Sequence, residues 1–187
     1  MVSHNDFWDF SLVIPEVFKE VGDLPEYACY GRWQERNWLN VPGPIYTGIT
    51  DTCLTGRPEA PDNVVYDENG QEFIFRQPRN RKELSQVVYA AMIDPFAGYV
   101  CDGNEHWTPA LIRDWWSRKP DLVNWIDQQL KNPEFKTHGD FVEQNQLQGL
   151  QDFQHFVEAG LHDYLRAYAF FLEQGQAPQE EQPLPWI

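Results

Sequence analysis

The longest regular pattern of apolar residues runs from about residue 140 to residue 174. Its apolar side chains recur every three or four positions, which places them on one face of a helix. A glycine, either Gly149 or Gly160, is expected to interrupt that helix. The face consists of Leu147, Leu150, Phe153, Val157, Leu161, Tyr164, Leu165, Tyr168, Phe171 and Leu172.

The same periodicity predicts shorter helices upstream. Asn80 and Thr108 are suitable N-cap residues, and Pro109 fits the first helical position after Thr108. A proline closes the pattern beginning at Asn80, and another closes the helix expected to start at Asp121. The expected helices cover about 6–21, 80–94, 108–119 and 121–131.

Residues 25–61 have no helical periodicity and are rich in glycine, proline and aromatic residues. We expect a long structured loop with short strands, which serves either as a functional site or as a brace held by its own large side chains. After this loop, Asn69-Gly70 separates two β-prone runs and predicts a hairpin at 63–76.

These elements predict a predominantly helical α+β fold with a small antiparallel β-hairpin or sheet. The chain has 187 residues, which suits one domain. We expect residues 1–175 to form that domain and residues 176–187, rich in Pro, Gln and Glu, to form a C-terminal tail. Leu184, Trp186 and Ile187 could fold back onto the core.

The net charge of the chain limits the classes of partner that we expect. The chain has 29 Asp and Glu against 14 Lys and Arg, a net charge of −15. Such a surface repels phosphate backbones and anionic lipids, so we expect no nucleic-acid or membrane partner and favour a basic protein. From Thr137 onward, the sequence has eight acidic residues and one basic residue, Arg166.

The start of the sequence lacks the features of a signal peptide, so we expect a cytoplasmic protein. We expect it to be a monomer or a weak homodimer.

The sequence offers no familiar catalytic fingerprint. Cys29, Cys53 and Cys101 are too widely spaced for a zinc or iron–sulfur motif and are expected to be reduced thiols, at least partly buried. GxSxG, HExxH, GxGxxG and phosphate-binding loop motifs are absent. We therefore assign no catalytic residue, metal or cofactor.

Two patterns keep an enzyme open as the alternative. Asp102, Glu105 and His106 gather acid and base groups before the Thr108 cap, although the same residues also suit a turn and a helix start. His155 and His162 lie at metal-like spacing on one helix face, as the polar flank of an amphipathic helix also does. That face also carries Asp152 and Glu158.

The segment 32–38 alternates cationic and indole side chains around Trp33 and Trp38. Such a segment can form a stacking surface for a base or sugar. With this net charge, an arginine laid across a core tryptophan, with Glu35 nearby, is the preferred interpretation.

Several further stretches carry a resemblance. They are 31–38, Val41-Pro42-Gly43-Pro44, 50–53, Gly56-Arg57, Gln71-Glu72-Phe73, Arg76-Gln77-Pro78, Asp94-Pro95-Phe96 and 106–109. Together they resemble a poorly characterised bacterial family over about residues 30–120. In length, acidity and lack of catalytic motif the chain also resembles immunity proteins of antagonistic toxin systems, such as contact-dependent inhibition or type VI effectors. This second resemblance implies a function class but no residue roles.

The sequence therefore predicts an immunity protein that neutralises a cognate toxin, an effector expected to be basic and to target nucleic acid. It would occlude the toxin's active site or an exosite. A small hydrolase or metal-dependent enzyme is the alternative, and a nucleic-acid mimic is a third class. The residues expected to face the partner are Asp102, Glu105, His106, Trp33, Trp38, Asp140, Glu143, Asp152 and Glu158.

Overall fold

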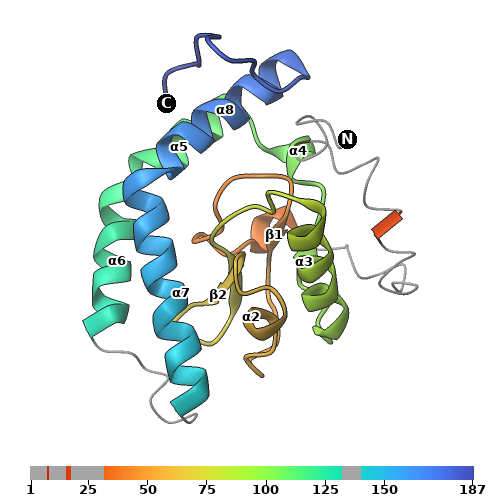
Figure 1. Ribbon diagram of the computed structural model, residues 1–187, viewed down its shortest axis with the longest axis vertical. Coiled ribbons are helices and arrows are strands. Elements are labelled where there is room, and N and C mark those ends of the chain that lie inside the picture. The colour runs from red at the N-terminus through yellow and green to blue at the C-terminus, as the bar shows by residue number, and fades with distance from the viewer. Residues whose placement is uncertain (1–7, 9–15, 18–31, 132–139) are drawn as a thin grey trace.

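A computed structural model describes residues 8, 16–17, 32–131 and 140–187. The C-terminal helices stand on one side of a centre that contains short strands, and helix α3 lies on the other side (Figure 1). This arrangement confirms a predominantly helical α+β fold. Within the described residues, no helix has the length and apolar character needed to cross a membrane.

The elements follow one another as η2 (Trp33–Glu35), β1 (Tyr46–Thr47), α2 (Gly56–Glu59), β2 (Val64–Tyr66), β3 (Glu72–Ile74), α3 (Arg81–Ile93), β4 (Tyr99–Val100), α4 (Gly103–His106), α5 (Pro109–Ser117), α6 (Lys119–Lys131), α7 (Asp140–Ala159) and α8 (Leu161–Gln174). The helix expected at 6–21 falls almost entirely outside the described residues.

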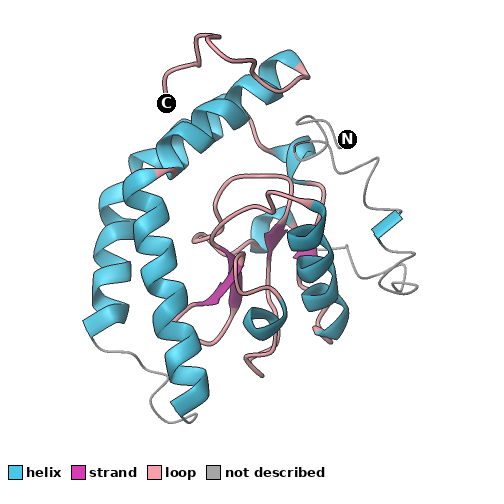
Figure 2. Cartoon of the chain, viewed as in Figure 1, coloured by secondary structure: helices cyan, strands magenta, loops and turns pink. Residues whose placement is uncertain are grey.

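The strands form two antiparallel pairs near the centre of the molecule (Figure 2). In the first pair, Val64 of β2 lies opposite Ile74 of β3, which confirms the hairpin predicted at 63–76. The second pair places Tyr46 of β1 opposite Val100 of β4. The sequence does not indicate this second pair, because strands of two residues are too short to show an alternating pattern.

The helix ends follow the predicted capping chemistry. Asn80 Oδ1 accepts a hydrogen bond from Glu83 N (3.0 Å), and Thr108 Oγ1 accepts one from Leu111 N (3.2 Å). The long C-terminal pattern breaks at Gly160, between α7 and α8, and continues through Gly149. Helix α6 begins two residues before the predicted Asp121, because a proline is tolerated in the first turn of a helix.

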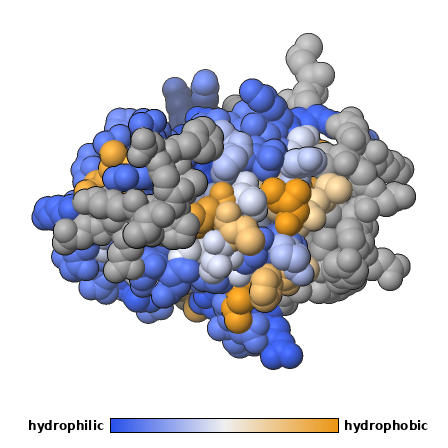
Figure 3. Space-filling view, turned by 90° about the horizontal axis from the view of Figure 1, so that it is seen from below, coloured by the Kyte–Doolittle hydropathy of each residue, from blue (hydrophilic) through white to orange (hydrophobic). Residues whose placement is uncertain are grey.

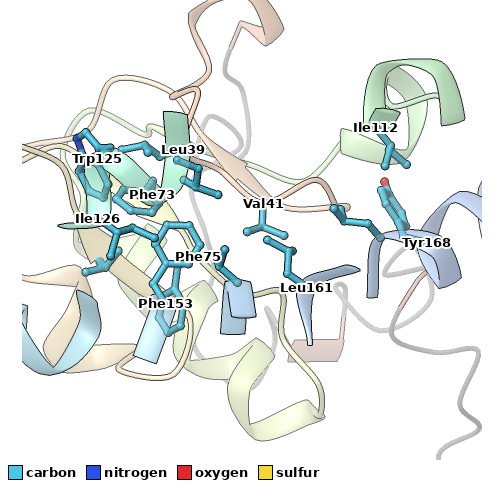
Figure 4. Packing of buried hydrophobic residues seen from close by; sticks show 14 of the residues in the cluster. Leu39, Val41, Phe73, Phe75, Ile112, Trp125, Ile126, Phe153, Leu161 and Tyr168 are labelled. Carbon is cyan, nitrogen blue, oxygen red and sulfur yellow. The ribbon is translucent and has the colours of Figure 1, made fainter. Parts of the chain in front are cut away.

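The main core lies between the C-terminal helices and the β2–β3 hairpin (Figure 4). Phe73 packs edge-on against Trp125, with ring centroids 5.7 Å apart, and also contacts Phe153 at 5.6 Å. Leu39 and Val41 come from the irregular segment before β1 and are fully buried in the same cluster. This segment is therefore part of the core.

A buried arginine joins the two halves of the fold. The side chain of Arg57 is only 2% exposed and donates to the carbonyl oxygens of Asn145 (2.6 Å), Pro61 (2.7 Å) and Val64 (3.0 Å). It also contacts Asp152 Oδ2 at 3.3 Å. These bonds connect α2 and β2 to α7.

Glu72 is a second buried residue with an ionisable side chain. Its carboxylate accepts hydrogen bonds from Gly56 N (2.7 Å) and Tyr99 Oη (2.5 Å), and the residue is 1% exposed. Burial is the main cause that raises the pKa of Glu72 from 4.5 to about 7; Asp51 and Asp94 add to this, whereas its hydrogen bonds oppose it. Ionisation of this group therefore costs stability in the folded protein.

We predict that Glu72→Gln removes a pH-dependent loss of stability. Because the folded protein holds the Glu72 proton more tightly than the unfolded chain, the contribution of Glu72 to wild-type stability is complete below pH 4.5 and is lost as pH rises through about 7. An amide can still accept from Gly56 N and donate to Tyr99 Oη. Urea unfolding across this range should show the variant gaining about 3 kcal/mol relative to wild type by pH 8. A constant difference across pH would contradict the prediction.

Residues 176–187 pack against α8 at several points. Arg166 donates to the carbonyl oxygens of Pro185 and Leu184, each at 2.9 Å, and Ile187 packs against the main core. The end of the chain thus folds back, as its apolar residues suggested, while Trp186 remains 85% exposed.

Cys53 is exposed and Cys101 half-buried, so the expectation of burial was wrong for Cys53.

Candidate functional site

The structure gathers three of the predicted partner residues into one cluster. The imidazole of His106 stacks on the indole of Trp33, with ring centroids 4.9 Å apart and an angle of 22° between the planes. His106 Nε2 lies 3.2 Å from Asp102 Oδ2, one helical turn earlier in the chain. The short helix α4 presents these two side chains to the loop that carries Trp33.

A tyrosine fixes the carboxylate from the other side. Tyr46 Oη donates to Asp102 Oδ1 at 2.8 Å, and the Tyr46 ring meets Trp33 edge-on at 5.2 Å. Burial, followed by the hydrogen bond to Asp102, raises the pKa of Tyr46 well above its usual value. Tyr46 therefore stays protonated and holds Asp102 in place.

An arginine covers the other edge of the cluster. The Arg36 guanidinium carbon lies 3.9 Å from the centroid of the Trp33 ring and 5.5 Å from that of Trp107. Arg36 Nη1 also donates to the carbonyl oxygen of Trp33 (2.9 Å). This confirms the expected arginine laid across a tryptophan, while Glu35 pairs with Arg32 at 3.1 Å.

We call the set Trp33, Arg36, Tyr46, Asp102, His106 and Trp107 the indole cluster. Its side chains are held by stacking and hydrogen bonds, yet those of Asp102 and His106 are 39% and 34% exposed. A partner would meet groups whose rotamers are already fixed. Such a surface loses little conformational entropy on binding.

A pocket of about 160 Å³ adjoins the indole cluster and is lined in part by Arg36, Trp107 and Trp38. Trp115 Nε1 donates to the carbonyl oxygen of Trp38 (3.0 Å), and the Arg118 guanidinium lies 4.6 Å from the centroid of the Trp38 ring. Trp38 therefore lines the same pocket as Arg36 and Trp107 of the indole cluster.

The other predicted partner residues are distributed differently. Glu105 is exposed beside His106, and Glu158 is exposed and Glu143 half-buried on α7. Asp152 pairs with Arg57 at 3.3 Å and also accepts from Gln148, so much of its hydrogen-bonding capacity is used internally. Asp140 begins α7, and its side chain lies outside the described residues.

The metal-like spacing on α7 and α8 does not produce a ligand set in the part of the chain that the structure describes. No group of three or more His, Cys, Asp and Glu side chains there is arranged to hold a metal ion. His162 instead lies beside Asp163 (3.6 Å) and near the ring of Trp116.

Apolar side chains are also exposed elsewhere. Ile49 and Phe96 are 57% and 65% exposed, and Leu111 is exposed on the rim of the pocket. In the view from below, apolar residues gather near the middle of the face and hydrophilic residues surround them (Figure 3). Apolar surface is therefore not confined to the indole cluster.

Comparison with known proteins gives no assignment. No family model, curated protein or solved structure matches the chain. The function must therefore be argued from the site itself.

Sequence reasoning did not connect Tyr46 with Asp102, or Arg118 with Trp38. These partners lie far apart in the chain, and no local spacing marks them. The density of tryptophan and arginine in 32–38 and 107–118 is the signal in the sequence that could have indicated both walls of the pocket.

Proposed function

We propose that this protein is an immunity protein that binds a basic, nucleic-acid-targeting toxin in the cytoplasm and neutralises it. The indole cluster and the adjoining pocket would form the anchoring part of the interface. Inhibition would follow from covering the toxin's active site or a neighbouring exosite, without turnover.

The observation that carries this proposal is the preformed indole cluster. Tryptophan, tyrosine and arginine dominate the binding energy of protein interfaces, especially where their packing is already fixed. Trp33 and Arg36 form such a group, the buried Trp107 packs against it, and His106 with Asp102 extends it toward solvent.

The acids of the C-terminal helices supply the second support. Glu158 and Glu173 are exposed, and the Asp163 side chain is 79% exposed. Together with the net charge of −15, they would raise the rate at which a basic partner arrives. Their contribution would be mainly to association, because exposed charges add little to the stability of a complex.

Co-expression with the product of the adjacent upstream gene, followed by kinetics of the purified pair, tests the proposal. We predict a co-eluting complex whose association slows at high salt. Replacing Glu158, Asp163 and Glu173 with Lys should slow association about tenfold or more at low salt. At high salt, the association rates of the variant and the wild type should become similar. A complex with salt-independent association would remove the electrostatic part of the proposal.

The His106–Asp102–Tyr46 arrangement favours a second candidate, a small hydrolase in which His106 acts as general base. His106→Ala separates the two candidates: for an inhibitor it weakens the complex, and for an enzyme it abolishes turnover while leaving any complex intact. Metal analysis of the purified protein tests the metal-dependent form of this candidate.

A further inference from the structure

The pocket beside the indole cluster is positively charged in a strongly acidic protein. Arg36 and Arg118 contribute two guanidinium groups to it, and Asp114 contributes one carboxylate. Arg118 Nε lies 3.9 Å from Asp121 Oδ2, in a pair whose side chains are both largely exposed. Asp121 lies outside the lining, so the lining itself carries two cations and one anion.

Arg36 has no anionic partner within the described part of the chain. Its contacts are the two indole faces and one carbonyl oxygen. Burial lowers the pKa of Arg36, which shows that the cation is partly removed from water. Indole faces compensate a guanidinium less well than a carboxylate, which can accept two hydrogen bonds from it.

One residue of the pocket lining also has an unsatisfied donor. Trp107 is 4% exposed, and its indole Nε1 is closed to solvent and has no hydrogen-bond acceptor. Because Trp107 lines the pocket, its indole serves as a reporter of a group bound there. A volume of about 160 Å³ accommodates a group the size of an acidic side chain.

We propose that this pocket binds a carboxylate, supplied by an aspartate or glutamate side chain of the partner protein. Arg36 and Arg118, which both line the pocket, would hold the carboxylate oxygens. The pocket would then fix the orientation of a partner that the acidic surface attracts. That a partner protein supplies the carboxylate rests on the proposed function, whereas the ability of the pocket to bind a carboxylate does not.

Titration with small probes tests the pocket without any toxin. The probes are N-acetyl-glutamate α-amide, which carries a free side-chain carboxylate, and its neutral glutamine counterpart, at constant ionic strength. The readout is the indole N–H signal of Trp107 in the full chain, assigned with Trp107→Phe. We expect a saturable shift of this signal with the carboxylate probe, half complete in about the millimolar range, and none with the amide.

Arg36→Met and Arg118→Met should each weaken this binding at least about tenfold. Arg118 is largely exposed, so its variant tests the pocket even if Arg36→Met perturbs folding. Arg113→Met, on the same helix outside the pocket lining, is the matched control and should bind as wild type does. An equal response to both probes, no saturable shift, or tighter binding of inorganic phosphate would overturn the assignment. Carboxylate binding without a toxin complex would leave the pocket in place and refute the proposed function.

Discussion

Arg57→Met should lower the free energy of unfolding by about 3–5 kcal/mol, because it removes the cation from a buried pair and several of its hydrogen bonds at once. The substitution leaves three carbonyl oxygens without this donor and Asp152 without its cationic partner. Helix α7 packs closely on the Arg57 side chain, since a Cβ at Gly149 would lie 2.6 Å from Arg57 Cζ. Urea denaturation followed by tryptophan fluorescence measures the change.

Arg32→Met is the matched control for this substitution. Arg32 also pairs with a carboxylate, but its side chain is 79% exposed. Pairs of this kind contribute little, so the control should stay within about 0.5 kcal/mol of wild type. Equal effects at the two arginines would show that Arg57 does not hold the halves of the fold together.

Asn40→Leu is the second substitution with a large expected effect. Asn40 is 1% exposed, and its side chain donates to the carbonyl oxygens of Asn37 (2.8 Å) and Thr47 (2.7 Å). Its Oδ1 accepts from Thr47 N (3.1 Å), Thr47 Oγ1 (3.1 Å) and Ile74 N (2.9 Å). Leucine has a similar volume but can make none of these five hydrogen bonds, so we expect a loss of about 3–4 kcal/mol.

Asn124→Leu provides the comparison for Asn40, because Asn124 lies on the exposed face of α6. Its free energy of unfolding should change by less than about 0.5 kcal/mol. A loss below about 1 kcal/mol for Asn40→Leu would contradict the view that this one side chain organises the segment before β1. The same urea titration serves both variants.

The helices could be predicted from the sequence because their signals are local. Asn80 and Thr108 cap the helices as expected, and Gly160 marks the break between α7 and α8. The hairpin followed from Asn69-Gly70 for the same reason. In each case, residues within a few positions of one another decide the structure.

The segment 32–61 could not be derived in this way. Its backbone is buried without forming long strands, so its polar groups need side-chain partners from distant positions. Asn40 and Gln77 meet this need: Gln77 Oε1 accepts from Ile45 N (3.1 Å), and its Nε2 donates to Ile45 O (2.6 Å). Asn40 and Gln77 are polar residues of a kind usually found at the surface, but here they are buried and hydrogen-bond the backbone of this segment.

The candidate site was partly predictable. The sequence singled out Trp33, Trp38, Asp102 and His106; the structure brings Trp33, Asp102 and His106 into contact and places Trp38 in the adjoining pocket. It did not indicate that Asp152 is engaged by Arg57, because the two are 95 positions apart. Spacing along one helix identifies a shared face but not what packs against it.

Rescue of growth by variants of this protein, co-expressed with the upstream toxin gene, tests the proposed function most directly. Wild type and Trp186→Ala, which changes an 85% exposed indole outside the cluster, should both restore growth. Trp33→Ala should fail to rescue at an expression level and fold stability at which the control succeeds, because a central interface tryptophan contributes about 2 kcal/mol or more. Absence of rescue by wild type, or full rescue by Trp33→Ala, would contradict an immunity function centred on the indole cluster.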